Sequence, residues 1–274
     1  MNRPPTPLTL TACFPGLRAL AWSGHHLYAS RGYDVLRAHV EDAHDITWQP
    51  VAHFRTSLRR RLSATNRLTA RLFRDGFHAL AFLPSAAIVG AVPSSIVTLG
   101  PGESEFRQTH AITRGTRPLH ITATPGGAAF WGEYFDNAQR DEVHIYGSQD
   151  AGATGSIAYA FRKGTIHHVH NIVHDPWVNC LWLRTGDCGD ECRILRASCD
   201  FSRVEIVMQG NQQGSSGGRS SHRRRSLVFF RYAVRIEPYL SIGPPGRALA
   251  TSPDQQFLYQ RMPRRPPCLL LNNG

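Results

Sequence analysis

A repeat of about 40–50 residues constrains the fold of this chain more than any other feature of its sequence. Two copies are clear. Each opens with a histidine, alternates apolar residues and reaches a proline, as in residues 120–125 (HITATP) and 170–176 (HNIVHDP). An aromatic apolar run, a polar loop and a segment beginning Asp-Glu follow in both copies, and a further apolar run, 157–161 or 204–208, closes them. Short alternating runs separated by turn residues predict four β-strands in every copy.

Weaker copies of the same pattern precede these two. Residues 78–84 (HALAFLP) open one copy, and residues 17–22 (LRALAW) open another that extends to Phe54. About four units therefore lie before residue 213. One unit cannot bury both faces of its sheet, whereas radial stacking of several units does so. The sequence thus predicts an all-β fold, a β-propeller of four-stranded blades.

The predicted blades occupy residues 17–213, between an N-terminal extension (1–16) and a basic segment (214–274). That segment holds ten arginines and only two acidic residues, Glu237 and Asp254, so it carries most of the formal net charge of +11. Because the basicity is local, it does not indicate a nucleic-acid partner for the chain as a whole.

Two interpretations of residues 214–274 stay open. The first is a disordered basic extension. The second is translation out of frame, because permissible codons for residues 214–243 also encode, one nucleotide away, a string with the strand and turn order of a blade. We favour the second, which predicts an incomplete propeller of about four blades where full-length relatives hold about six or seven. An open sheet edge and weak function would follow.

Residues 148–155 (SQDAGATG) resemble the Asp-box, S-x-D-x-G-x-T-W, of sialidases and other BNR-repeat propellers, with glycine in place of the final tryptophan. The segment lies between the predicted third and fourth strands of a blade, and its motif residues are Ser148, Asp150, Gly152 and Thr154. We expect Asp150 to accept hydrogen bonds from turn amides and Gly152 to permit an unusual φ. Such a turn supports the fold and specifies no chemistry.

The chain is thus similar to bacterial propellers described as BNR-repeat or glycosyl-hydrolase-like proteins, over residues 17–213. The resemblance implies a glycan-binding or scaffold role. It does not extend to a sialidase active site, since residues 54–57 (FRTS) do not match the F/Y-R-I-P motif that precedes the repeats of those enzymes. The alternative is a metal-assisted carbohydrate-active enzyme, either a polysaccharide lyase or a glycoside hydrolase.

His78, His120 and His170 each open the first strand of a predicted blade. First strands line the central channel of a propeller, so three equivalent imidazoles there can bind a divalent metal. This arrangement resembles that of oligogalacturonate lyases. The other interpretation is that each histidine is an inherited repeat marker that bonds to the neighbouring strand. Strand alternation also places His168 and His174 on the same face as His170.

Three carboxylates, Glu133, Asp187 and Asp190, lie at predicted strand ends or loops that can face the channel. Their spacing alone does not pair them as acid and base. Four of the six cysteines fall within residues 180–199 without C-x-x-C spacing. A metal cluster there is one interpretation, and small apolar strand and loop residues are the favoured one.

No apolar run approaches the roughly 20 residues that span a bilayer. Residues 1–16 lack the extended apolar core of a signal peptide, so we expect a cytoplasmic protein. Carbohydrate is the expected partner, without a membrane and with no indicated oligomeric state. Nucleic acid is the weakest of the partner classes: residues 59–61 and 223–225 are arginine runs, but 57–73 contain no interleaved aromatic residues for base stacking.

Overall fold

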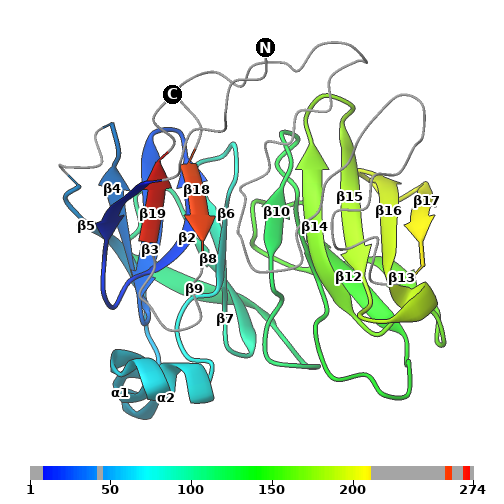
Figure 1. The fold of residues 1–274 in the computed structure, drawn as a ribbon, viewed down its shortest axis with the longest axis horizontal. Coiled ribbons are helices and arrows are strands. Elements are labelled where there is room, and N and C mark those ends of the chain that lie inside the picture. Colours follow the sequence, from blue (N-terminus) through cyan, green and yellow to red (C-terminus); the bar gives the residue numbers. More distant parts are fainter. Residues whose placement is uncertain (1–8, 42–45, 211–256, 261–267, 272–274) are drawn as a thin grey trace.

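The computed structural model describes residues 9–41, 46–210, 257–260 and 268–271. About half of these residues form β-strands, nearly all of them in antiparallel pairs, which Figure 1 shows standing side by side across the molecule. The prediction of a predominantly β fold built from four-stranded units is therefore confirmed for the described part of the chain.

The strands between residues 18 and 209 form four consecutive units of four. The first unit contains β2 (Arg18–Ser23), β3 (His26–Arg31), β4 (Asp34–His39) and β5 (Gln49–Phe54). The second contains β6 (Ala79–Phe82), β7 (Ile88–Val92), β8 (Ser95–Leu99) and β9 (Glu105–Ala111). The third contains β10 (Ile121–Ala123), β11 (Ala129–Gly132), β12 (Val143–Ser148) and β13 (Ser156–Phe161). The fourth contains β14 (Val169–Asp175), β15 (Cys180–Thr185), β16 (Arg193–Ser198) and β17 (Val204–Gln209).

Each unit is an antiparallel meander in which neighbours in sequence are neighbours in the sheet. The first and second units also join through a short parallel pairing of β5 with β9, at His53↔Glu105 and Phe54↔Phe106. The first strands of successive units contact one another, β2 with β6, β6 with β10 and β10 with β14. Meanders whose first strands line up in this way have the arrangement of propeller blades.

Most of the hydrophobic core lies between the units, although a small cluster of Leu27, Ala38 and Val40 lies within the first unit. One cluster joins the first two units, with Leu20 and Phe106 among its members. A second cluster joins the second and third units through Val89 and Trp131, and a third joins the third and fourth. Burying a side chain of this size contributes about 1.5–3 kcal/mol. The stacking of faces that the repeat predicted is therefore what holds the sheets together.

The third and fourth units approach closely at Gly132, the last residue of β11. A Cβ atom at this position would lie 2.4 Å from the Cβ of Val169, which opens β14. Only glycine leaves room for that contact without a backbone shift. Gly132 thus sets how closely β14 lies against the loop that follows β11.

A separate three-stranded sheet brings the two ends of the chain together. It contains β1 (Thr9–Cys13), β19 (Cys268–Leu271) and β18 (Phe257–Gln260), in the order β1-β19-β18. Residues 211–256 lie outside the described residues, so most of the segment that we suspect to be out of frame has no structural description.

The arginine-rich residues 57–73 form two short helices between the first two units, α1 (Leu58–Thr65) and α2 (Arg67–Leu72). Ser57 caps the first helix, where its Oγ accepts a hydrogen bond from the Arg60 amide at 3.4 Å. A 3-10 turn, η1 (Gly189–Glu191), lies between β15 and β16. Among the described helices, none has the length and apolar character needed to cross a bilayer.

The turn between β12 and β13 is held by the side chain of Asp150. Its Oδ1 accepts from the Thr154 amide at 2.9 Å and its Oδ2 from the Thr154 hydroxyl at 2.6 Å. Ser148 Oγ donates to Asp150 Oδ1 and accepts from the amide of Gly152, whose φ is +86°. The hydrogen bonds expected of Asp150 are therefore present. The Thr154 hydroxyl is the main cause that lowers the pKa of Asp150 to about 2.

A similar turn occurs at the equivalent place in the fourth unit. Asp200 Oδ1 accepts from the amide and the hydroxyl of Ser202, at 3.1 and 2.8 Å. Hydrogen bonds from Ser198 and Ser202 lower the pKa of Asp200 to about 2. In two successive units, an aspartate that accepts hydrogen bonds within the turn thus stabilises the last hairpin.

Replacing Asp150 by asparagine should lower the free energy of unfolding at pH 7 by about 1 kcal/mol, since the site is exposed to solvent. The folded-state pKa of Asp150, about 2, lies below its ordinary value of 3.8. Its carboxylate therefore contributes stability above pH 3.8 that is lost as the pH falls through about 2. Urea unfolding at several pH values should show a difference between wild type and Asp150→Asn that narrows toward pH 2. Asp34→Asn, at an exposed position in β4, is the matched control and should change little.

Candidate functional site

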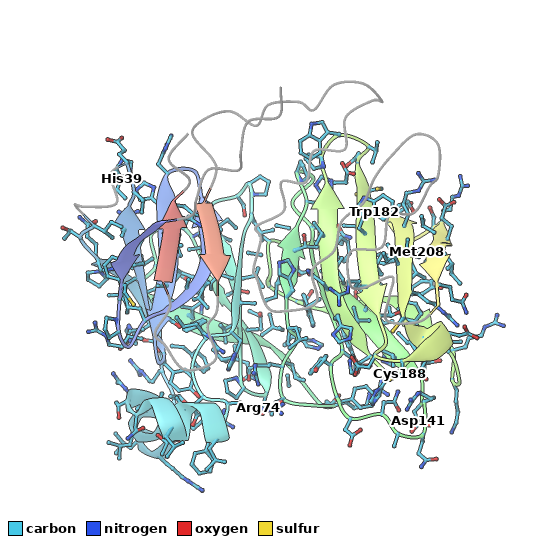
Figure 2. All side chains as sticks on the ribbon, viewed as in Figure 1. His39, Arg74, Asp141, Trp182, Cys188 and Met208 are labelled. Carbon is cyan, nitrogen blue, oxygen red and sulfur yellow. The ribbon has the colours of Figure 1, made fainter. Side chains whose placement is uncertain are left out.

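The candidate site lies at the end of the fold that also carries the two helices. Because the strands alternate in direction, the loops before β6, β10 and β14 and the loops after β11 and β15 meet at this end. Figure 2 labels Arg74, Asp141 and Cys188, which come from three of these loops and lie along the same lower edge. Polar residues that are distant in sequence thus lie close together at the helix-bearing end of the fold.

Glu133 is the central group of the site. It follows β11, and its side chain is 5 % exposed. Arg114, from the loop before β10, donates from Nε to Glu133 Oε1 at 2.9 Å and from Nη2 to Oε2, a two-pronged ion pair. The backbone amide of His144 donates to Oε2 at 2.7 Å, and the Tyr146 hydroxyl lies 3.5 Å from Oε1. A carboxylate paired in this way is positioned firmly and its charge is neutralised.

Arg114 also ties together the surrounding loops. Its Nη1 donates to the carbonyl of Glu142 at 2.7 Å, and its guanidinium lies over the ring of Phe135 at 4.9 Å. His144 Nε2 lies 2.7 Å from the Glu142 carboxylate, and its Nδ1 lies 2.8 Å from Arg114 Nη2. Because protein groups bond to both Glu133 and Arg114, this ion pair forms a rigid side of the site, and Glu133 is not free to act as an acid or a base.

A small pocket opens beside this ion pair, and we call it the arginine pocket. Its wall contains three aromatic side chains, Trp131, Tyr134 and Tyr146, together with Arg114, Arg117 and Glu133. His110 completes one side, with its ring 4.8 Å from that of Tyr146 and 5.5 Å from that of Trp131.

Arg117 has donor capacity that the described residues do not use. Its Nη1 is buried and has no hydrogen-bond partner in the part of the chain that the structure describes. Burial, and then the charge of nearby Arg74, lower the pKa of Arg117 to about 10, so its guanidinium is still cationic at neutral pH. A buried cationic donor without a partner is costly unless a ligand supplies an acceptor.

The second polar group is the histidine cluster, formed by His167, His168 and His170 around Asp187. His168 Nε2 lies 3.3 Å from Asp187 Oδ2, and His170 Nε2 lies 2.9 Å from Asp187 Oδ1. The two Nε2 atoms are 3.3 Å apart. His167 Nδ1 lies 3.9 Å from Asp187 Oδ2, while its Nε2 accepts from the Asn137 amide at 2.8 Å.

Burial keeps two of these rings neutral. It is the main cause that lowers the pKa of His168 to about 4, and the charge of His170 adds to it. Burial also lowers the pKa of His170. At neutral pH both rings are therefore in the form that binds metal ions.

Tyr134 separates the two groups and touches both. Its ring centroid lies 4.3 Å from that of His168 and 5.8 Å from that of His170, while the same residue lines the arginine pocket. The backbone connects them as well, because the Val169 amide donates to the Glu133 carbonyl at 3.0 Å. The arginine pocket and the histidine cluster are thus neighbouring parts of one surface.

The structure places the three histidines predicted as metal ligands in different surroundings. His78 contacts Arg18 and bonds through Nε2 to the Arg74 carbonyl at 2.7 Å, and His120 immediately precedes β10. Only His170 belongs to the histidine cluster. One group of described residues whose potential ligand atoms all lie within 4.8 Å of one another is His167, His168 and Asp187. The metal site of His78, His120 and His170 stays a prediction.

Sequence reasoning named Glu133 and Asp187 as carboxylates near the channel, but it missed Arg114, Arg117 and Tyr134. The segment RGTRP contains both arginines, yet nothing in its pattern separates them from solvent-exposed loop residues. Of the cysteines, Cys180 is buried in β15, while Cys188 is exposed. In the described residues no cysteine belongs to a group with metal-ligand spacing.

Comparisons with known proteins give likenesses of structure only. No protein-family model matches the chain. No curated protein matches its sequence. Among solved structures, a TolB described from Agrobacterium tumefaciens has a TM-score of 0.48 and 15% identity, over 73% of this chain and 65% of that one. A chain of a nidogen–laminin complex has a TM-score of 0.46 and 16% identity, over 68% of this chain and 63% of that one. A protein described as a 6-phosphogluconolactonase from Bacteroides uniformis has a TM-score of 0.44 and 13% identity, over 70% of this chain and 54% of that one. The chain spans less than two thirds of each.

Glu133→Gln should lower the free energy of unfolding by about 2–3 kcal/mol, because it leaves the partly buried Arg114 without a charge partner. Glu142→Gln is the matched control. The Glu142 side chain is 53% exposed and bonds to His144, so its loss should cost less than about 1 kcal/mol. Chemical denaturation followed by tryptophan fluorescence measures both. Equal effects of the two variants would contradict the central position of Glu133.

Proposed function

We propose that the arginine pocket, which has room for about one water-sized group, receives the carboxylate of a small acidic carbohydrate whose ring lies at the pocket's rim, and that the chain is a glycan-binding propeller of the sialidase-like, BNR-repeat kind. The observation that carries the proposal is the buried Nη1 of Arg117, which has no partner among the described residues and borders a pocket with aromatic walls. The polar turns at 148–154 and 198–202 support the family assignment, because they recur at the place where Asp-boxes occur.

The charge of the pocket favours an anion. Arg114, Arg117 and the nearby Arg74 contribute three positive charges, and Glu133 neutralises only one of them. A carboxylate that accepts from Arg117 would form a charge-assisted hydrogen bond, which is about twice as strong as a neutral one. It would also remove the cost of the unpaired donor.

The remaining wall favours a sugar ring over a simple ion. Tyr134 and Tyr146 are partly exposed, so each presents an apolar ring with a hydroxyl at its edge. Aromatic surfaces with a few convergent polar groups are typical of small-molecule sites. A pyranose offers an apolar face for such rings, hydroxyls for their polar edges and, in a uronic acid, the carboxylate for Arg117.

A second candidate function is a metal-assisted carbohydrate-active enzyme, a polysaccharide lyase or glycoside hydrolase. The observation that favours it is the histidine cluster on the other side of Tyr134. A metal ion there would polarise the carboxylate of a bound acidic sugar. Glu133 does not serve as the base in this proposal, because Arg114 and the His144 amide already engage its oxygens.

We also propose that the propeller is incomplete, with about four blades and an out-of-frame remnant of further blades after residue 213. The four meanders before residue 210 support the blade order. Sequencing the gene around codon 213 tests the idea. A frame that reads on as further blades after one inserted or deleted nucleotide is expected, whereas an intact frame with a similar tail in close relatives would refute it.

Titration calorimetry with a galacturonate trimer tests the binding proposal. The carboxyl-reduced trimer is the matched ligand control, because it keeps the rings and hydroxyls but lacks the charge. We expect the acidic trimer to bind and the reduced one to bind at least about 10-fold more weakly, as expected when a charged hydrogen bond is lost.

Arg117→Gln should weaken binding of the acidic trimer by about 10- to 100-fold, since it removes the charged donor. Arg203→Gln makes the same change of charge at an exposed site in the turn before β17 and should leave affinity unaltered. Equal binding of both trimers, or equal affinities of the two variants, would refute the assignment of Arg117.

A further inference from the structure

His168, His170 and Asp187 have the geometry of a metal site. Their facing atoms are separated by 3.3 Å (His168 Nε2 to His170 Nε2), 3.3 Å (His168 Nε2 to Asp187 Oδ2) and 2.9 Å (His170 Nε2 to Asp187 Oδ1). Ligands that surround a tetrahedral zinc ion at about 2.0–2.2 Å lie about 3.3–3.6 Å from one another. The separation of the two imidazole nitrogens and that of His168 Nε2 from Asp187 Oδ2 match such edges. His170 Nε2 faces the other carboxylate oxygen, Oδ1, at a distance a few tenths of an ångström shorter.

We propose that the histidine cluster binds a divalent first-row transition ion such as Zn²⁺ through His168 Nε2, His170 Nε2 and the Asp187 carboxylate. The proposal concerns a different site from the predicted one, since it retains only His170 of the histidines expected to bind metal. It does not depend on sugar binding in the arginine pocket.

Hydrogen bonding alone accounts poorly for this grouping. The Nε2 atom of His170 lies within hydrogen-bond distance of the Gly186 carbonyl, of Asp187 Oδ1 and of the second imidazole nitrogen. A neutral ring has one N–H in all, so it satisfies only part of that set. A cation placed between the two imidazoles and the carboxylate pairs with these three groups at once, although not with the Gly186 carbonyl.

His167 is not one of the ligands in this proposal. Its Nε2 accepts a hydrogen bond from the Asn137 amide at 2.8 Å, so the proton of the neutral ring is on Nδ1. A protonated nitrogen cannot coordinate a metal, and Nδ1 faces Asp187 Oδ2 at 3.9 Å.

The donor set indicates the class of ion. Imidazole nitrogen with one carboxylate oxygen suits zinc and its first-row neighbours, whereas calcium and magnesium prefer oxygen alone. Three protein ligands leave one tetrahedral position open, as in catalytic rather than structural zinc sites. The Asp187 side chain is 50% exposed, so the open position can be reached from solvent.

The test uses the full chain after removal of metal with a chelator. Titration with Co²⁺, which adopts zinc-like geometry, should give one equivalent of binding and the visible d–d bands of a four-coordinate ion. No thiolate charge-transfer band is expected, although Cys192 Sγ lies 3.7 Å from the Gly186 carbonyl beside the site. Zn²⁺ should displace the Co²⁺ and raise the melting temperature.

Three variants, His168→Gln, His170→Gln and Asp187→Asn, should each weaken Zn²⁺ binding by at least about 100-fold. His174→Gln is the matched control, because this histidine is also in β14 but bonds to Asn179 at 3.0 Å, away from the cluster. Circular dichroism checks that each variant is folded. If the buried His168 variant fails to fold, the more exposed Asp187→Asn decides the matter.

Three results would each overturn the metal site. They are Co²⁺ binding that does not saturate at one equivalent, a thiolate-to-Co²⁺ charge-transfer band, and unchanged Zn²⁺ affinity in the folded Asp187→Asn variant. Since no sugar is present in this experiment, its failure leaves the proposal for Arg117 unaffected. Conversely, loss of sugar binding in Arg117→Gln has no bearing on Zn²⁺ affinity.

Discussion

The four-stranded units of this chain bury apolar side chains against one another, and the structure depends on these contacts. Ile145 in the third unit and Leu183 in the fourth are almost fully buried, and they lie in one cluster that spans the two units. Phe77 and Phe106, with ring centroids 4.9 Å apart, pack within the cluster that joins the first two units. Most of the free energy of burial therefore comes from contacts between units, since only the small cluster around Leu27 lies within one unit.

This stacking also determines where chemistry is possible. When first strands lie against one another, their starting ends and the loops that precede them converge at one end of the fold. Gly132 tightens the approach of the third and fourth units there, because any larger residue would collide with Val169. The loops after β11 and before β14 are consequently held close together, and Tyr134 from one contacts His168 from the other.

Neighbouring groups at this end have contrasting electrostatics. Glu133 and Arg114 neutralise each other and are fully engaged, which makes them structural. Arg117 and the two neutral imidazoles have capacity that the described residues do not use or use only in part. An anion complements Arg117, and a cation complements the two imidazoles. Tyr134 lies between them, so a carboxylate-bearing ligand bound to Arg117 would lie near an ion held by His168 and His170.

The repeat pattern was sufficient to predict the β fold, the four-stranded units and the polar turn around Asp150, because strand alternation and turn chemistry are local properties of the chain. It also singled out His170, Glu133 and Asp187, although without their partners.

The arginine pocket could not be predicted from the sequence, because Arg114 and Arg117 form a site only together with Glu133 and with aromatic residues more than a dozen positions away. The same holds for the histidine cluster. Equivalent positions in successive blades led us to join His78, His120 and His170, whereas in the folded chain Asp187, from the loop after β15, lies beside the start of β14 and selects His168 and His170. Periodicity reveals which face of a strand a residue occupies, but the distance between two loops is decided by how the sheets pack.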